Sequence, residues 1–386
     1  MLSPRSLEAS NADLGVSVDA LAAPAEDEGE RLHDTFSIGG LFIDIFGHRQ
    51  ADIKLPPPWV LFRSKGGTPD LRIDVERVPS LSSSSERHVF DSGSVWRLYS
   101  NRGEGFRFDF SSPALTDSPY KRLFVNARFS RATLQLSEEW LAIRGYEVPP
   151  LEYPLDELLI MHRLTQESAI ELHGCGIVGA DGTGNLFVGH SGAGKSTTAR
   201  LWAAREGIEI LSDDRIIVRR DEGGSAVEMP CESAGAVQGK GILRLRTNFA
   251  SRSSCSAQDD NVERASVQDD KAEKQIPRFA RNDKPRYKIR MYGTPWHGEA
   301  QFASPANAPL TRICILEHGY GNVLTRLSPG QAVAELFARS FVPFHRHEYL
   351  ESALAFLEDV AGSIPCYRYF FEPDERAVDT ILNFHD

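Results

Sequence analysis

The residues of this chain with the clearest chemistry form a glycine-rich stretch near its middle. The run GHSGAGKS, residues 189–196, matches the pattern G-x-x-x-x-G-K-[ST] at every fixed position. Glycines let consecutive backbone N–H groups turn toward one phosphate chain, and a helix that begins there adds its positive end. The ammonium of Lys195 can reach terminal phosphates, and the hydroxyl of Ser196 can bind Mg²⁺. The stretch therefore predicts a nucleotide-phosphate site.

The segments on either side of this stretch have the composition that phosphate binding needs. NLFV, before it, is a short apolar run typical of a strand, and KSTTARLWAAREG, which continues it, is typical of a helix that stops at a glycine. Strand, loop and helix in this order bring a helix N-terminus to the phosphates. The predicted nucleotide contacts are Gly189, His190, Ser191, Gly192, Ala193, Gly194, Lys195, Ser196 and Thr197.

Two adjacent carboxylates follow the glycine-rich stretch after about one helix and one strand. They are Asp213 and Asp214, in IEILSDDRIIV. Beside a magnesium–phosphate site, one carboxylate can take a proton from an attacking hydroxyl while the other holds the metal. Asp-Asp-Arg is also common as a simple turn between two strands. Its position so soon after the phosphate stretch favours the catalytic interpretation.

One histidine belongs to the same part of the chain. His173, in LHGCGIV, precedes Gly189 by 16 residues. If the two segments form neighbouring strands, its imidazole lies near the phosphate end of the sheet. The alternative is a structural histidine satisfied by backbone groups, and the residues alone favour that alternative.

Other residues carry weaker signals. His345, Arg346 and His347 could hold an anion or a metal, but we interpret them as a solvated loop. Trp296, in TPWHGE, is either a core residue or a wall of an acceptor site, and the sequence does not separate the two. The five cysteines lie far apart and lack the spacing of a zinc site, which indicates buried or idle thiols in a reducing cytosol.

Two polar segments predict disorder. Residues 1–34 are rich in Ser, Ala, Asp and Glu and lack periodicity, which is typical of a disordered leader. Residues 247–286 are rich in Asp, Glu, Arg, Ser and Gln and contain few apolar residues. We interpret them as a solvated, mostly disordered insertion, with a longer regulatory loop as the alternative.

The remaining segments predict two ordered domains. Residues 35–150 contain alternating apolar runs such as LRIDVERV, SVWRLYS and ATLQLS, which predict a β-rich domain, with SLSSSSER as a loop. Residues 155–386 mix strand patterns, such as AIELHGCGIVG, LTRICILEHG and PCYRYFFEP, with helical ones. One of these helices has Ser328 as its N-cap and Pro329 in its first turn, and another ends at Gly362.

The overall charge argues against two classes of partner. The formal net charge is −11 and the isoelectric point is near 5.5, whereas binders of nucleic acid or anionic membranes need clustered Lys and Arg. No run approaches the ~18 consecutive apolar residues of a membrane span. The N-terminus lacks a basic head followed by an apolar run, so we expect no signal peptide and a cytoplasmic protein.

Taken together, the motifs resemble those of one family. LHG, GHSGAGKST and SDD, in this order and at this spacing, are similar to the catalytic domain of HPr kinase/phosphorylase. They resemble more distantly the ATP-dependent phosphoenolpyruvate carboxykinases, which share its nucleotide-binding fold. The nearer likeness is to HPr-serine-kinase-like proteins, a group that includes some lasso-peptide kinases, and YGTPWHGEA and ASPANAPL resemble that group too. The resemblance covers about residues 155–372 without the insertion.

The resemblance implies an α/β fold, with a P-loop kinase domain of the HPr kinase/phosphoenolpyruvate carboxykinase type after the β-rich domain. It implies ATP and Mg²⁺ as cofactors, with Lys195 and Ser196 in the roles given above. His173 would lie in the active site near the carboxylate pair. Asp213 would be the general base, and Asp214 would assist metal or acceptor positioning. An acid on a later strand would complete the Mg²⁺ site; Glu299 is our choice and Glu232 the alternative.

The chain also departs from the family. Thr197 stands where HPr kinases have a glutamate, and their EIRGLG and PGRN segments are absent from the sequence. We therefore expect no phosphorylase activity and a substrate other than HPr. The expected function is an ATP-dependent serine kinase acting on a protein or peptide. The sequence leaves open whether the protein is a monomer or a homo-oligomer.

Two other classes stay open. A small-molecule phosphotransferase or carboxykinase-like enzyme would need cationic residues around a compact anion, with Arg215, Arg219 and Arg312 as candidates. A binding module would use the nucleotide as a switch, with the β-rich half holding a partner.

Overall fold

The computed structural model describes residues 31–101, 105–112, 116–221 and 288–384. These residues belong to one compact unit, which comprises residues 1–222 and 287–386. Residues 1–30 of the predicted leader, the predicted insertion and Glu232 lie outside the described residues. In the described ranges, no helix is both long and apolar enough to cross a lipid bilayer.

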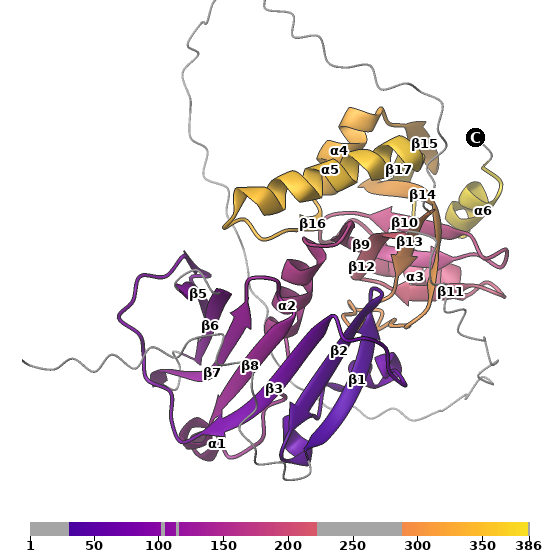
Figure 1. The fold of residues 1–386 in the computed structure, drawn as a ribbon. Helices are drawn as coiled ribbons and strands as arrows, with labels where there is room; N and C mark the ends of the chain where they lie inside the picture. Colours follow the sequence, from indigo (N-terminus) through magenta and orange to yellow (C-terminus); the bar gives the residue numbers. More distant parts are fainter. Residues whose placement is uncertain (1–30, 102–104, 113–115, 222–287, 385–386) are drawn as a thin grey trace, which may run out of the picture. The chain divides into compact units, whose positions relative to one another are not determined.

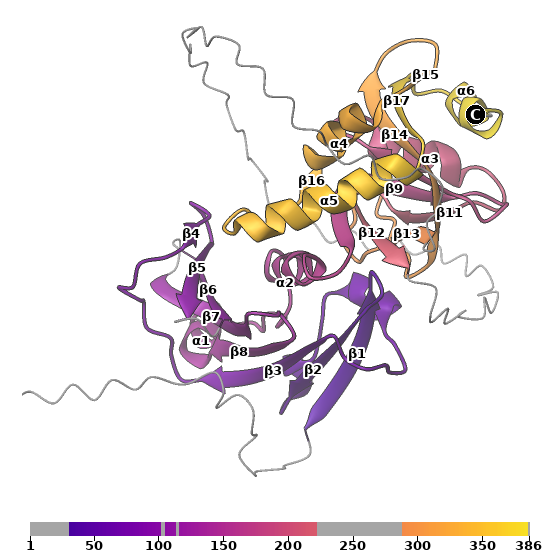
Figure 2. The same cartoon turned by 45° about the horizontal axis from the view of Figure 1, so that its top comes forward.

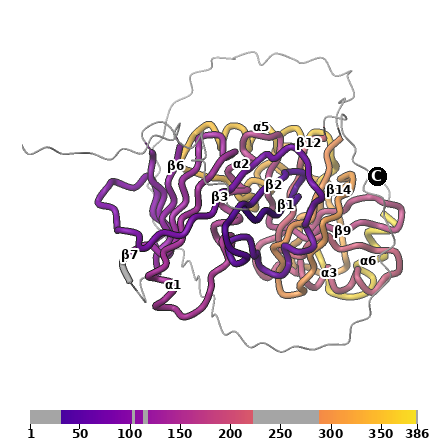
Figure 3. The backbone as a smooth tube through the Cα atoms, turned by 60° about the horizontal axis from the view of Figure 1, so that its bottom comes forward, coloured from indigo at the N-terminus to yellow at the C-terminus, as the bar shows by residue number. Residues whose placement is uncertain are grey.

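The first sheet has eight strands in the order β1-β2-β3-β8-β7-β6-β5-β4 (Figures 1 and 3). Neighbouring strands are antiparallel, except that β3 runs parallel to both β2 and β8. The predicted strands of the β-rich segment and its predicted loop are confirmed. The strands are β1 (Leu32–Ile38), β2 (Leu41–Gly47), β3 (Leu71–Val78), β4 (Phe90–Asp91), β5 (Trp96–Asn101), β6 (Gly105–Ser112), β7 (Thr116–Asn126) and β8 (Arg131–Ser137).

The predicted leader is wrong over its last residues. Strand β1 begins at Leu32, and its residues up to Asp34 already pair with β2, from Gly47 to Ile45. Only three residues are involved, and His33 and Asp34 are polar, so the local sequence shows no periodicity and only the partner strand reveals their conformation.

Short helical elements went unpredicted in the same part of the chain. They are η2 (Gln50–Asp52), η3 (Pro57–Phe62) and α1 (Glu138–Arg144). The side chain of Ser137 caps α1 by accepting a hydrogen bond from the backbone N–H of Trp140, and Gly145 ends the helix. Both signals are present in the sequence, but the helix is too short for an apolar periodicity.

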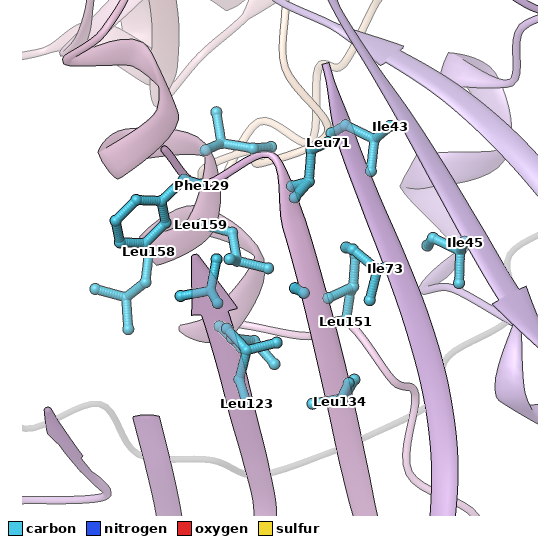
Figure 4. Packing of buried hydrophobic residues seen from close by; sticks show 14 of the residues in the cluster. Ile43, Ile45, Leu71, Ile73, Leu123, Phe129, Leu134, Leu151, Leu158 and Leu159 are labelled. Atoms are coloured by element: carbon cyan, nitrogen blue, oxygen red, sulfur yellow. The ribbon is translucent and has the colours of Figure 1, made fainter. Parts of the chain in front are cut away.

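Helix α2 (Leu155–Leu164) lies in the chain between the strands of the first sheet and those of the second. Its apolar side chains pack against the first sheet, where Leu158 and Leu159 lie beside Phe129 (Figure 4). The same hydrophobic core includes Ile217, which belongs to the second sheet. Burial of this apolar surface holds α2 between residues of both sheets.

The second sheet has nine strands and follows the path β10-β9-β12-β13-β14-β17-β15, with β11 and β16 paired to β9. Strands β10, β14 and β17 are parallel, so their carboxyl ends meet at one edge of the sheet. The strands are β9 (Ala169–Val178), β10 (Gly184–Val188), β11 (Glu209–Ser212), β12 (Arg215–Asp221), β13 (Lys288–Tyr292), β14 (Asn307–His318), β15 (Val323–Arg326), β16 (Ser340–Phe341) and β17 (Cys366–Phe371).

Helices cover both faces of the second sheet. Alternate residues of β10 enter different cores: Leu186 and Val188 pack in the core under α4 (Pro329–Phe337) and α5 (His347–Ser363), whereas Phe187 packs in the core under α3 (Lys195–Ala203) and α6 (Arg376–Leu382). Helices α4 and α5 lie side by side in Figures 1 and 2. A β sheet with helices on both faces places this part of the molecule in the α/β class.

The predicted ends of these helices agree closely with the structure. The side chain of Ser328 caps α4 by accepting the backbone N–H of Gln331, and Pro329 is the first helical residue, as predicted. Helix α5 continues one residue past the predicted stop at Gly362. Cys175, Cys314 and Cys366 are buried free thiols, which confirms the prediction for the three cysteines that the structure describes.

Candidate nucleotide-binding site

The glycine-rich stretch forms a loop between strand β10 and helix α3. The strand ends at Val188 and the helix begins at Lys195, which confirms the predicted order of strand, loop and helix. Gly192 (φ 82°) and Gly194 (φ 104°) lie in the left-handed region that favours glycine. A Cβ atom at Gly194 would also lie 2.9 Å from the ring of Phe371, at the end of β17. The backbone path therefore requires the glycines of the motif.

Lys195 folds back onto this loop. Its Nζ donates hydrogen bonds to the carbonyl oxygens of Gly189 at 3.0 Å and His190 at 2.9 Å. Burial disfavours the charged ammonium and lowers the pKa of Lys195 to about 8, although the nearby carboxylate of Asp214 raises it. The ammonium thus lies within the loop, where it can exchange these carbonyls for phosphate oxygens.

Asp213 lies at the centre of a closed set of hydrogen bonds. The hydroxyl of Ser196 donates to its Oδ2 at 2.9 Å. Backbone N–H groups of Gly298, Ala300 and Phe302 donate to its two oxygens at 3.0, 2.9 and 3.2 Å. The side chain is buried, and four donors fill the acceptor capacity of a carboxylate. Asp213 therefore joins the glycine-rich loop to the segment 298–302.

Asp214 has a more open environment. Its Oδ1 lies 3.0 Å from Nε2 of His173, and its Oδ2 accepts a hydrogen bond from Nη1 of Arg215 at 2.6 Å, while 27% of its side chain stays exposed. Burial alone would raise the pKa of Asp214, but the hydrogen bond from His173 and the charge of Arg215 outweigh it, and the pKa is lowered. Asp214 is therefore the more exposed carboxylate of the pair.

Strand pairing brings His173 to this point. Strand β9 runs antiparallel to β10, with Gly174 opposite Val188, and the N–H of Gly189 donates to the carbonyl oxygen of His173 at 3.4 Å. On its other side β9 pairs with β12, with His173 opposite Arg215. The imidazole contacts a carboxylate, so the alternative of a histidine satisfied only by backbone groups is wrong.

Glu299 is placed differently from the expectation. It lies in a turn between β13 and β14, not on a strand, and its side chain is exposed. The neighbouring residues Gly298 and Ala300 contribute their backbone N–H groups to Asp213. The sequence predicted that this segment contributes a carboxylate, whereas in the structure it contributes backbone N–H groups to Asp213. Every residue type except proline has such a group, so the sequence gives no sign of this role.

The arginines of the small-molecule alternative do not gather around one point. Arg219 donates to the carbonyl oxygen of Gly39 in the first sheet and to Glu167. Arg312 donates to the carbonyl oxygens of Ile381 and Phe384, near the C-terminus. Of the three candidates, only Arg215 contacts the carboxylate pair.

The prediction of a solvated loop at residues 345–347 is wrong for His345. Its ring lies 5.3 Å from that of Phe106, 5.1 Å from that of His162 and 5.4 Å from that of Tyr349. Burial lowers the pKa of His345 to about 4. Contact with strand β6 of the first sheet buries it, and that contact is invisible in the local sequence.

The oxygen donors at the loop suit a magnesium ion. A hydroxyl from Ser196 and a carboxylate from Asp213 meet at 2.9 Å beside Lys195, and Mg²⁺ prefers such hard oxygen ligands, supplemented by phosphates and water. The described residues contain no group of three or more His, Cys, Asp or Glu side chains that could hold a metal by themselves. These residues alone would not complete the ligands of a metal, so they would suit a metal that reaches the loop already bound to a nucleotide.

Comparison with known proteins was negative in two respects. No protein-family model matches the chain, and no curated protein matches it.

Proposed function

We propose that this protein is an ATP-dependent serine kinase of the HPr kinase type, which transfers the γ-phosphoryl group to a seryl hydroxyl of a protein or peptide. One observation carries the proposal. The hydroxyl of Ser196, at the start of α3, contacts Asp213, and the adjacent Asp214 contacts His173. A phosphate loop and an accessible carboxylate thus lie side by side, as phosphoryl transfer to a hydroxyl requires.

The loop would bind the phosphates of ATP. Backbone N–H groups of residues 189–194 and the N-terminus of α3 would contact them, and the ammonium of Lys195 would neutralise part of their charge. The hydroxyl of Ser196 would be a ligand of the accompanying Mg²⁺, and Asp213 would hold that hydroxyl through its hydrogen bond. The metal, when bound, supplies further charge neutralisation. Positioning and charge neutralisation provide most of the catalysis in phosphoryl transfer.

The geometry favours an exchange of the roles that the sequence suggested for the two carboxylates. Asp213 is buried and receives four hydrogen bonds, so we assign it to the loop and the metal. Asp214 is partly exposed, so we assign it as the group that accepts the proton of the seryl hydroxyl. The seryl oxygen bonds to the γ-phosphorus, the bond to the β–γ bridging oxygen breaks, and ADP leaves. His173 and Arg215 would orient the Asp214 carboxylate.

Transfer of label from γ-³²P-ATP tests this proposal. We expect wild-type protein with Mg²⁺ to label an acceptor in cell extract on serine, and the Asp214→Asn variant to lose the labelling while binding ATP normally. Nucleotide binding without transfer to any acceptor would contradict the kinase and favour the switch module. Turnover of oxaloacetate would instead favour the carboxykinase-like alternative.

A further inference from the structure

Two adjacent acids in the first turn of α2 are buried, which is unusual for this position. Acids in a first turn normally face water, where they complement the helix dipole. Asp156 is only 2% exposed and Glu157 only 8%. A buried carboxylate is costly unless it is paired. The partners of these two acids therefore show what they do.

Asp156 holds the segment that surrounds Asp213. Its Oδ2 accepts a hydrogen bond from Nε1 of Trp296 at 3.0 Å. The carbonyl oxygen of Trp296 in turn accepts the hydroxyl of Ser212 at 2.8 Å, and Gly298, two residues after the tryptophan, donates its N–H to Asp213. The indole is partly buried and packs against the hydrophobic core of the first sheet and α2, so the position of Trp296 depends on that core and on Asp156.

Glu157 holds the arginine that contacts Asp214. Its Oε1 accepts a hydrogen bond from Nε of Arg215 at 2.8 Å, and Nη1 of the same guanidinium donates to Oδ2 of Asp214 at 2.6 Å. The guanidinium also lies over the ring of Phe341, at 4.1 Å from its centroid. Arg215 thus approaches Asp214 in an orientation that Glu157 helps to set.

A third buried acid, Glu171, also lies near Arg215 but does not take the place of Glu157 as its hydrogen-bond partner. Oε1 of Glu171 lies 3.3 Å from Nε of Arg215. Burial raises the pKa of Glu171 well above its usual range, and the charge of Glu157 raises it further. The hydrogen bond from Nε of Arg215 goes to Glu157 at 2.8 Å, so Glu157 is the closer partner of Arg215.

From these contacts we propose that Asp156 and Glu157 form an acid clamp that positions both carboxylates of the catalytic pair from helix α2. Asp156 acts on Asp213 through Trp296, and Glu157 acts on Asp214 through Arg215. Both are positioning residues, since neither touches the reacting groups. Leu155 anchors the helix that carries them in the hydrophobic core of the first sheet. Leu158 and Leu159 of the same helix belong to that core too (Figure 4). The clamp rests on the proposed kinase function, and it makes the first sheet part of the catalytic scaffold.

Substitutions at Glu157 test the clamp through the rate of labelling of the acceptor in extract. For Glu157→Ala we expect kcat to fall about 10- to 100-fold, with the KM for ATP within about threefold of wild type, because positioning but not phosphate binding is lost. Glu157→Gln keeps an oxygen that accepts from Arg215, so it should recover most of the rate. At the neighbouring position, Asp156→Ala should likewise lose more of the labelling rate than Asp156→Asn.

The matched control is Asp109→Ala. Asp109 is also a buried acid, and it accepts hydrogen bonds from Arg122 at 2.6 and 2.9 Å, but its contacts lie within the first sheet. We expect this variant to lose stability without losing kcat. If Glu157→Ala lowers kcat no more than Asp109→Ala does at equal thermal stability, or if it raises the KM for ATP instead, the clamp is overturned.

A second readout does not depend on phosphoryl transfer. Diethyl pyrocarbonate modifies free imidazole nitrogens, and mass spectrometry locates the modified histidine. In Glu157→Ala, Asp214 should hold Nε2 of His173 less firmly, so His173 should react at least about threefold faster than in wild type or Asp109→Ala. An unchanged rate would contradict the clamp. If wild-type protein labels no acceptor, the kinase proposal fails, and the rate at His173 still decides the clamp.

Discussion

The phosphate half and the carboxylate half of the candidate site are built in different ways. The loop at 189–194 and the start of α3 come from one short segment, whose glycines and lysine are adjacent in the chain. The surroundings of Asp213 and Asp214 come from β9, the turn before β12, the segment 298–302 and helix α2. A local structure depends on few residues, whereas an assembled one depends on many, so the halves should respond differently to substitution.

The largest contrast is expected in stability. Asp213→Ala would leave three backbone N–H groups and the hydroxyl of Ser196 without their acceptor in a buried place. We expect the free energy of unfolding to fall by about 3 kcal/mol or more, since each buried donor without a partner costs about 1–3 kcal/mol. Urea denaturation of both proteins measures the difference. A loss below about 1 kcal/mol would show that the segment 298–302 holds itself in place.

Lys195→Ala should give the opposite pattern. It removes a buried ammonium whose partners are two carbonyl oxygens, so stability should stay within about 1 kcal/mol of wild type. Phosphoryl transfer should fall about 10²- to 10³-fold, because the developing charge loses its main cation. Rates of labelling from γ-³²P-ATP and a parallel urea curve check both parts. Full activity in this variant would remove the lysine from the site.

Asp214→Asn should separate chemistry from binding. The amide keeps the size of the side chain but is a far weaker base, so the labelling rate should fall about 10²-fold. The dissociation constant for ATP, measured by calorimetry, should change less than about threefold because the phosphate loop is intact. The control is Asp213→Asn, for which we expect weaker ATP binding in the presence of Mg²⁺. If Asp214→Asn keeps its rate, proton transfer belongs to another group.

The smallest expected effect is a pH dependence at Lys195. Its pKa falls from 10.5 to about 8 in the folded protein. Between these values the unfolded chain binds more protons than the folded one, so the contribution of Lys195 to stability rises with pH. Relative to Lys195→Met, wild-type protein should gain about 2 kcal/mol in free energy of unfolding between pH 8 and 10. ATP affinity at constant Mg²⁺ should fall over the same range. If the difference in free energy of unfolding between the two proteins does not change with pH, the lysine titrates normally.

Local sequence patterns predicted most of the secondary structure. Alternating apolar residues marked several strands of both sheets, and the signals at Ser328 and Pro329 located the start of α4. Strand β7 (Thr116–Asn126) was not singled out, although it is 11 residues long. Other elements that went unpredicted are short, such as β16 (Ser340–Phe341) and η3 (Pro57–Phe62). The conformation of such short elements depends on a partner strand or on a core, so their sequences show no periodic pattern.

In the candidate site, too, the local sequence predicted some features and distant contacts decided the others. The residues at 189–196 specify a glycine-rich loop before a helix by themselves, because glycine conformations and a helix N-terminus are local properties of the chain. The family resemblance implied that His173 lies near the carboxylate pair, and strand pairing brings its imidazole to Asp214. The sequence could not say which carboxylate is accessible, since that depends on three N–H groups from a segment more than 80 residues away.

By itself, then, the sequence determined the glycine-rich loop, the strands and helices beside it, and the types of residue available for chemistry. Tertiary structure alone decided that Asp213 is enclosed, that Asp214 is open and paired with His173, and that Asp156 and Glu157 lie behind them. The physical reason is that backbone conformation follows from neighbouring residues, whereas burial and the pairing of charges follow from contacts between distant ones.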